Sequence, residues 1–88
     1  MAKFKHKGIS IEYDEKFING YTMAKARACA EDEPSRFFRA LGKLYGGRDE
    51  EYAEALGDSS DAMLELIRAT YDHAGENAKN SSDSQPQS

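Results

Sequence analysis

The stretch PSRFFRALGKLYGG, residues 34–47, contains a start signal, an apolar stripe and a stop signal of a helix. Pro34 suits the first helical position, where its missing N–H costs no hydrogen bond, and the acids of residues 31–33 complement the positive end of the helix dipole. Gly46 and Gly47 end the helix. The apolar residues recur at helical spacing and form one stripe, made of Phe37, Phe38, Leu41, Leu44 and Tyr45. The stretch therefore predicts a helix that buries one side.

Two more helices are predicted on the C-terminal side. Residues 48–58, RDEEYAEALGD, form a short acidic helix that stops at Gly57. Its inward residues are Tyr52, Ala55 and Leu56. Asp58 or Ser59 then caps a final helix that carries Leu66 on the shoulder of its buried face. That buried face is predicted to consist of Met63, Leu64, Ile67, Tyr71 and Ala74.

A helix and a hairpin are predicted on the N-terminal side. Asp14 caps a helix that begins at Glu15 and carries Gly20 near its middle. Its predicted apolar face consists of Phe17, Ile18, Tyr21, Ala24 and Ala28. Before it, AKFKHKGISIEYD alternates with period two on both sides of Lys7 and Gly8, which predicts a β-hairpin that turns there. Its apolar face carries Phe4, Ile9, Ile11 and Tyr13, and its exposed face carries Lys3, Lys5 and Lys7.

These elements predict an α+β fold that is mostly α-helical, with about four helices and an N-terminal β-hairpin. A chain of 88 residues has room for one domain, which we assign to residues 1–74. The closing GENAKNSSDSQPQS, residues 75–88, has no apolar side chain larger than Ala78, so it cannot offset its ordering entropy. We expect a disordered polar tail there. Because the predicted core is small, the domain gains stability from self-association or from a partner.

The net charge of -4 conceals an asymmetry along the chain. Residues 1–28 hold six Lys or Arg against three Asp or Glu, whereas residues 29–88 hold six against thirteen. Nucleic-acid modules usually present a basic face with aromatic or arginine readers, so this balance argues against DNA or RNA as the main partner. The chain has no run of ~18 apolar residues and no secretory h-region, so we expect a soluble intracellular protein without a membrane partner.

Neither a metal site nor catalysis is predicted. Cys29 is the only cysteine, which excludes an internal disulfide, and its alanine-rich surroundings favour a structural role. His6 and His73 stand alone near opposite ends of the chain, so no ligand set is arrayed for a metal. The acids of residues 31–33 and 49–51 are adjacent rather than held apart in a pocket, as an acid–base pair requires. We therefore predict no enzyme and no cofactor.

The adjacent rings of Phe37 and Phe38 have two interpretations. Neighbouring residues diverge by ~100° around a helix, so a small bundle buries one ring well and the other only if its apolar stripe is wide. A broad core stripe is one interpretation. The other is a hydrophobic groove that receives an amphipathic helix. The residues predicted to form this groove are Phe37, Phe38, Leu41 and Tyr45, together with Tyr21, Leu64 and Ile67.

The order of these features resembles a known family. A hairpin is followed by helices, by GGRDEEYAEALGD at residues 46–58 and by a polar tail with AKNSS at residues 78–82. This layout resembles the small tail assembly chaperones of long-tailed phages and prophages of Gram-positive bacteria, over nearly the whole chain. The resemblance implies a non-enzymatic helper in the host cytoplasm that self-associates. It also implies that the helper coats the long helical tape measure protein, prevents its aggregation and brings tail tube subunits to it.

The resemblance also bears on the tail. Many members of this family are made in two lengths, the longer one when ribosomes slip back one nucleotide near the end of the short frame. The Ala-Lys-Asn peptide of residues 78–80 can be encoded by codons with a slippery run, so the resemblance implies Lys79 and Asn80 as the frameshift position. The longer form would then contact the tail tube protein. An ordinary disordered terminus is the alternative.

Two other functions fit the same sequence. Residues 34–56 can be interpreted as the paired helices of a helix-turn-helix regulator, which predicts salt-sensitive DNA binding. A virion structural protein, such as a head-to-tail connector, would stay in finished particles, whereas a chaperone would leave them.

Overall fold

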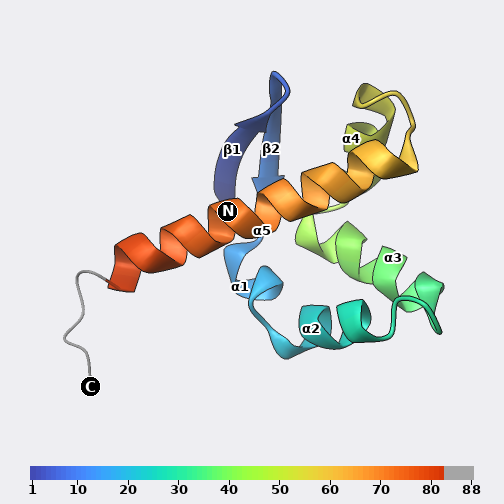
Figure 1. Ribbon diagram of the computed structural model, residues 1–88, viewed down its shortest axis with the longest axis horizontal. Coiled ribbons are helices and arrows are strands. Elements are labelled where there is room, and N and C mark those ends of the chain that lie inside the picture. The colour runs from blue at the N-terminus through green and yellow to red at the C-terminus, as the bar shows by residue number, and fades with distance from the viewer. Residues whose placement is uncertain (83–88) are drawn as a thin grey trace.

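The structure, a computed structural model, describes residues 1–82, with side chains described up to Glu76 (Figure 1). It is a small, mostly helical fold with an N-terminal hairpin, which confirms the predicted class. In Figure 1 the last helix crosses the whole molecule, with the hairpin on one side in this view and the first three helices on the other. The elements are β1 (Ala2–His6), β2 (Ile9–Tyr13), α1 (Glu15–Ile18), α2 (Tyr21–Ala28), α3 (Pro34–Leu44), α4 (Asp49–Ala55) and α5 (Ser60–Ser82).

The hairpin forms as its alternation predicts. β1 and β2 pair antiparallel, with Phe4 opposite Ile11. Lys7 and Gly8 both have positive φ, 51° and 80°, as a two-residue turn of type I′ requires. The three lysines of the first arm are exposed, while Ile11 and Tyr13 of the second are fully buried. One face of this two-stranded sheet therefore lies on the helices, which gives it the support that an isolated hairpin lacks.

The helix predicted from Glu15 onward is in fact two helices. The side chain of Asp14 accepts hydrogen bonds from the N–H groups of Lys16 and Phe17, as a capping residue does, but α1 ends at Ile18. Gly20 then acts as the N-cap of α2. The predicted apolar face of this helix was wrong beyond this break, because the break resets the helical phase. Tyr21, Ala24 and Ala28 are exposed, and Met23 and Ala26 are buried instead.

The next two helices follow their predicted boundaries. Pro34 occupies the first turn of α3, and Gly46 and Gly47 follow its end with φ of 63° and 84°. The N–H of Asp14 donates to the carbonyl of Leu44 at 2.8 Å, which ties the end of the hairpin to the end of α3. Three acids fill the first turn of α4, where they complement the helix dipole.

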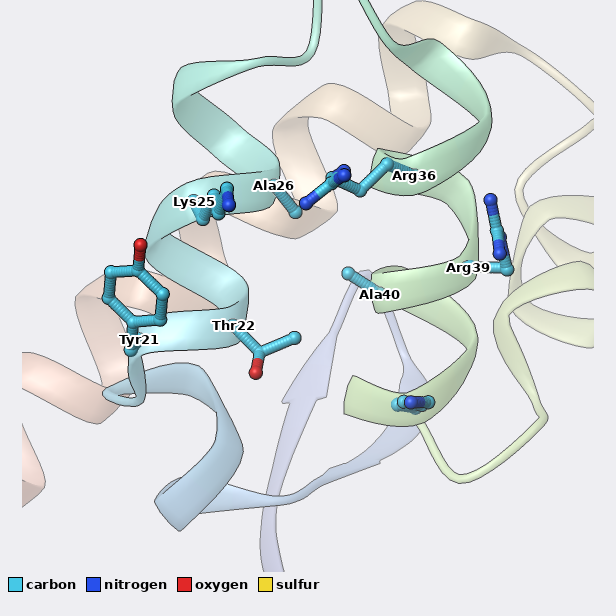
Figure 2. Close-up of a pocket in the computed structure, with 8 residues that line it drawn as sticks. Tyr21, Thr22, Lys25, Ala26, Arg36, Arg39 and Ala40 are labelled. Atoms are coloured by element: carbon cyan, nitrogen blue, oxygen red, sulfur yellow. The ribbon is translucent and has the colours of Figure 1, made fainter.

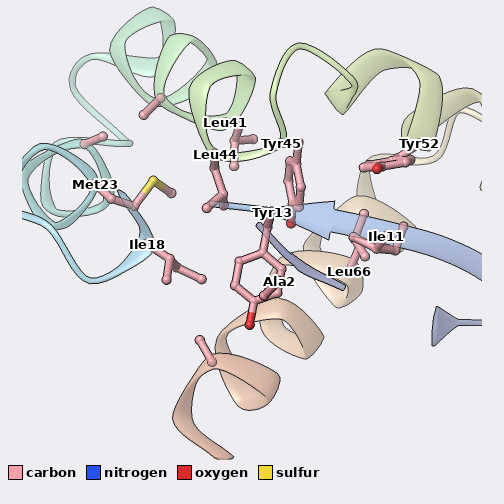
Figure 3. Close-up of a cluster of buried hydrophobic side chains, with 13 residues drawn as sticks. Ala2, Ile11, Tyr13, Ile18, Met23, Leu41, Leu44, Tyr45, Tyr52 and Leu66 are labelled. Carbon is pink, nitrogen blue, oxygen red and sulfur yellow. The ribbon is translucent and has the colours of Figure 1, made fainter. Parts of the chain in front are cut away.

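The last helix contributes the centre of the core, with a different face from the predicted one. Leu66 and Thr70 are fully buried, and Ala74 nearly so, whereas Leu64 is 53% exposed. Leu66 was predicted on the shoulder and Leu64 on the buried face. The face is rotated because α5 packs against β1 of the hairpin, against α1 and against α4. Figure 3 shows Leu66 of α5 next to Ile11 of β2.

The core is a single cluster that joins the hairpin to every helix (Figure 3). Its members are Ala2, Ile11, Tyr13, Ile18, Met23, Ala26, Ala40, Leu41, Leu44, Tyr45, Tyr52, Leu66 and Ala74. Polar contacts close its edge. The hydroxyl of Tyr13 lies 2.8 Å from Nδ1 of His73, and the ring of Phe4 stacks on His73 with centroids 4.9 Å apart. His73 thus fastens α5 to the hairpin.

The C-terminal part of α5 overlaps the predicted tail. The helix runs on to Ser82, past the predicted domain end at residue 74. Residues 83–88 of that tail lie outside the described residues. Among the described helices, none combines the length and the apolar character that crossing a membrane requires.

Candidate protein-binding groove

An apolar groove lies where α3, α4 and α5 meet. Its volume is about 400 Å³. We call it the α3–α5 groove, and its lining residues are Phe37, Phe38, Leu41, Asp49, Glu50, Ala53, Ser60, Met63, Leu64 and Ile67. A concave, mostly apolar surface with a few polar groups is the usual form of a binding site.

Helical spacing explains how these residues come together. The α3 residues stand at i, i+1 and i+4, and the α5 residues at i, i+3, i+4 and i+7 from Ser60, so each set shares one face of its helix. The α4 residues Asp49, Glu50 and Ala53 likewise share one face. One face of each of the three helices therefore lines the groove.

The groove has a buried floor and exposed apolar edges. Leu41 forms the floor and is 4% exposed, while Phe37 and Ile67 are half-buried. Phe38 is 62% exposed, and its ring centroid lies 6.0 Å from that of Phe37. Leu64 across the groove is 53% exposed. Two large, exposed apolar side chains line the same groove, which is typical of an interaction site.

The polar part of the groove is acidic. Asp49 and Glu50 belong to the first turn of α4, and no Lys or Arg lines the groove among the residues that the structure describes. The same two carboxylates complement the positive end of the α4 dipole, so their position has a structural cause as well. A helix that docks here is matched best if it carries Lys or Arg beside its apolar stripe.

The structure brings together five of the seven residues that the sequence singled out for binding. Phe37, Phe38 and Leu41 line the groove from α3, and Leu64 and Ile67 line it from α5. Phe38 is the member of the aromatic pair that reaches solvent.

The prediction of Tyr45 as an accessible binding residue was wrong. Its side chain is fully buried, and its hydroxyl lies 2.8 Å from Oγ1 of Thr70. Burial raises the pKa of Tyr45 to about 12. Tyr45 caps the C-terminal end of α3, where the chain turns toward α4. Its ring meets that of Tyr52 edge-on, with centroids 5.6 Å apart, so it belongs to the core.

Tyr21 is exposed, as a binding residue must be, but it does not line the groove. Its side chain is 77% exposed and lies in a separate cleft between α2 and α3. The break at Gly20 turns it away from the residues that it was grouped with. The frameshift positions Lys79 and Asn80 lie in the last turns of α5, where side chains are outside the described residues.

Sequence reasoning missed several residues of the groove. Met63 stands four residues before Ile67, and this spacing indicates that both share a face, but Met63 was assigned to the core alone. Asp49, Glu50 and Ala53 were not connected with binding, because the position of α4 depends on the turn at residues 45–48 and on Tyr52 in the core. Comparisons of this chain with protein-family models, with curated proteins and with solved structures found no match.

Proposed function

We propose that this protein is a phage tail assembly chaperone that holds an amphipathic helix of the tape measure protein in the α3–α5 groove. The observation that carries the proposal is the groove itself, with Phe38 and Leu64 exposed at its edges. The assignment of the tape measure protein as the occupant is based on the sequence resemblance. On the same resemblance, the protein acts in the host cytoplasm, and a longer frameshifted form recruits the tail tube protein.

The physical role of the groove is to cover apolar surface. A long helical protein that exposes an apolar stripe aggregates unless the stripe is covered, because removing apolar area from water is favourable. Helices dock in grooves through anchors at i, i+3, i+4 and i+7. The buried side chain of Leu41 forms a floor for such anchors, and the exposed ring of Phe38 adds apolar contact area at the edge of the groove.

The test is co-expression of the tape measure protein with the full chain and its variants. We expect the double variant Phe38→Ala, Leu64→Ala to stay folded, because substitutions at exposed sites usually change stability by only ~0.5 kcal/mol each. We expect the tape measure protein to become insoluble with it, because truncation of both apolar contacts at the edges of the groove costs about 2 kcal/mol of binding in total, roughly a 30-fold loss of affinity. The measurement is the soluble fraction of the tape measure protein.

Tyr21→Ala is the matched control, since it removes an exposed aromatic ring outside the groove. It should leave the tape measure protein soluble. If the groove variant protects the tape measure protein as well as the unmodified chain does, the groove is not the binding site. Salt-sensitive binding of duplex DNA would favour the regulator instead, and recovery of the chain in finished particles would favour the connector.

A further inference from the structure

A second cavity lies between α2 and α3 (Figure 2). Its volume is about 380 Å³, which falls in the range of pockets that hold small molecules. Figure 2 shows Ala26 of α2 and Ala40 of α3 facing each other. Both are buried, and their small side chains leave the space above them open. We call this cavity the α2–α3 cleft.

The charged side chains that line the cleft are all cations, which makes it basic. They are Lys25 from α2 and Arg36, Arg39 and Lys43 from α3. The three cations of α3 stand at i, i+3 and i+7, so they share one face of that helix over ~10.5 Å. The chain as a whole has a net charge of -4, so this face is a local exception.

The chain itself neutralises little of this positive charge. Arg36 pairs with Glu33. Lys25, Arg39 and Lys43 make no ion pair within the part of the chain that the structure describes. Like charges around one cavity repel one another and raise the local potential. A bound anion relieves this repulsion, so the cleft favours an anionic ligand.

An aromatic ring and a hydroxyl lie beside these cations. Tyr21 is 77% exposed, and Nζ of Lys25 lies 6.0 Å from its ring centroid. A ring with this exposure adds little to the core, but it offers a face on which a nucleobase can stack. Thr22 adds a hydroxyl that can donate to a phosphate oxygen. The cleft therefore matches a ligand that combines phosphate with a planar ring.

The acidic turn between the two helices limits the length of such a ligand. The chain runs along α2, turns through residues 29–33 and returns along α3, and this turn carries three acids at residues 31–33. Tyr21 begins α2 and Lys43 stands near the end of α3, so both lie at the end of the cleft that is away from the turn. A continuous polyanion along the cleft would meet the acids, whereas a single nucleotide ends before them.

We propose that the α2–α3 cleft binds a nucleotide, with its phosphate groups among Lys25, Arg36 and Lys43 and its base on the ring of Tyr21. Arginine and lysine are the residues that most often bind phosphate groups. At ~100° per residue, the cleft residues and the groove residues of α3 lie on opposite faces of the helix. The cleft is therefore a second site, and the proposal does not depend on the proposed function.

The experiment is isothermal titration calorimetry of the full chain at about 0.05 M salt. The probes are ADP, pyrophosphate without the base, and adenosine without the phosphates. We expect ADP to bind with a Kd below ~1 mM and at least ~tenfold more tightly than either fragment, because each fragment lacks one of the two contacts. Raising the salt to about 0.5 M should weaken the binding of ADP, since the cations are exposed.

Two charge-matched variants test the position of the phosphate groups. Lys25→Gln, Lys43→Gln removes one cation from each wall of the cleft and should weaken ADP binding at least ~tenfold. Lys3→Gln, Lys5→Gln removes the same charge from the exposed face of the hairpin and should change the affinity less than ~twofold. All four lysines are exposed, and circular dichroism should show both variants folded.

Tyr21 is tested separately. Tyr21→Ala should bind ADP no more tightly than pyrophosphate, because the stacking face is lost. Tyr21→Phe keeps that face and should bind ADP like the unmodified chain. The groove variant Phe38→Ala, Leu64→Ala should also bind ADP like the unmodified chain, so the two proposals can fail independently.

Four results would overturn the proposal. The first is an unmodified chain that does not bind ADP. The second is an equal loss of ADP affinity in the two lysine variants, which would show attraction to net charge rather than a site. The third is ADP binding that Tyr21→Ala leaves unchanged. The fourth is displacement of ADP by a lower concentration of a single-stranded oligonucleotide or a glutamate-rich peptide, which would assign the cleft to a nucleic-acid strand or to an acidic protein segment.

Discussion

Tyr45 links the end of α3 to the middle of α5 through one buried hydrogen bond. Oγ1 of Thr70 donates to the carbonyl of Leu66 at 2.7 Å, so its single proton is already used. The hydroxyl of Tyr45 therefore donates to Thr70. Both side chains are fully buried, and the arrangement satisfies both hydroxyls without water.

This phenol predicts a loss of stability at alkaline pH. Because burial raises the pKa of Tyr45 from 10.0 to about 12, folding favours the neutral form. That contribution is complete below pH ~10 and is lost as pH rises from ~10 to ~12, at about 1.4 kcal/mol per pH unit. We expect the free energy of unfolding to fall by about 2 kcal/mol more in the unmodified chain than in Tyr45→Phe.

The measurement is urea unfolding of both proteins at about pH 8 and about pH 11.5. At the lower pH, Tyr45→Phe should be less stable by about 1 kcal/mol, the usual worth of one hydrogen bond. Parallel pH dependence in the two proteins would mean that Tyr45 is not the responsible group.

The helices owe their boundaries to glycines with opposite backbone requirements. Gly20 has φ of -87° and ψ of 167°, which any residue adopts, and its role as N-cap has no side-chain hydrogen bond. Gly47 has φ of 84°, the left-handed region that favours glycine. The first glycine is therefore replaceable and the second is not.

The same substitution should act with opposite sign at these positions. Gly20→Ser supplies a capping hydroxyl, and its Cβ would stand 3.4 Å from the carbonyl oxygens of Lys16 and Phe17, an ordinary contact. We expect it to raise the free energy of unfolding by about 0.5–1 kcal/mol. Gly47→Ser should lower it by about 1–2 kcal/mol, although its Cβ meets nothing within 4 Å, because the backbone is strained. Thermal unfolding of both variants measures the difference, and shifts of the same sign would contradict it.

Signals that act within a few residues predicted most of the helices and strands. The I′ turn at Lys7 and Gly8, the Asp14 cap and the start at Pro34 depend only on near neighbours in the chain. The division between α1 and α2 was missed because Gly20 is compatible with either a weakened helix or a new N-cap. Because of this ambiguity, Tyr21 was predicted on the apolar face of the helix, whereas its side chain is exposed.

At the scale of the whole molecule, the hairpin and the helices share one core and should unfold together. Leu66 packs fully buried between them, whereas Leu64 lies two residues away in the same helix and is 53% exposed. We expect Leu66→Ala to cost about 2–5 kcal/mol, from lost burial and a cavity. Leu64→Ala should cost less than about 1 kcal/mol.

Urea unfolding followed by far-UV circular dichroism and by tyrosine fluorescence measures both variants. The two signals should change together in one transition, as they do in a two-state domain. Separate transitions would show that the hairpin unfolds independently of the helices. An equal loss in the two variants would contradict the orientation of α5.

The sequence by itself determined the α+β class, the hairpin and its exposed lysines, the boundaries of α3 and α4, and the start of α5, but not its end at Ser82. It also singled out five residues of the groove, among them Phe37, Phe38 and Leu64, because apolar residues at helical spacing mark one face of a helix. These properties follow from turn chemistry, capping and periodicity, which act within a few residues.

Only the tertiary structure decided which face of each helix is buried. Tyr45 and Leu66 became core residues because α5 and the hairpin pack beside them, and Tyr21 became exposed. The basic cleft combines Lys25 of the basic first part of the chain with cations of α3, which whole-chain charge counting could not reveal. The physical reason is that burial and local potential depend on neighbours in space, and packing brings together segments that are distant in the sequence.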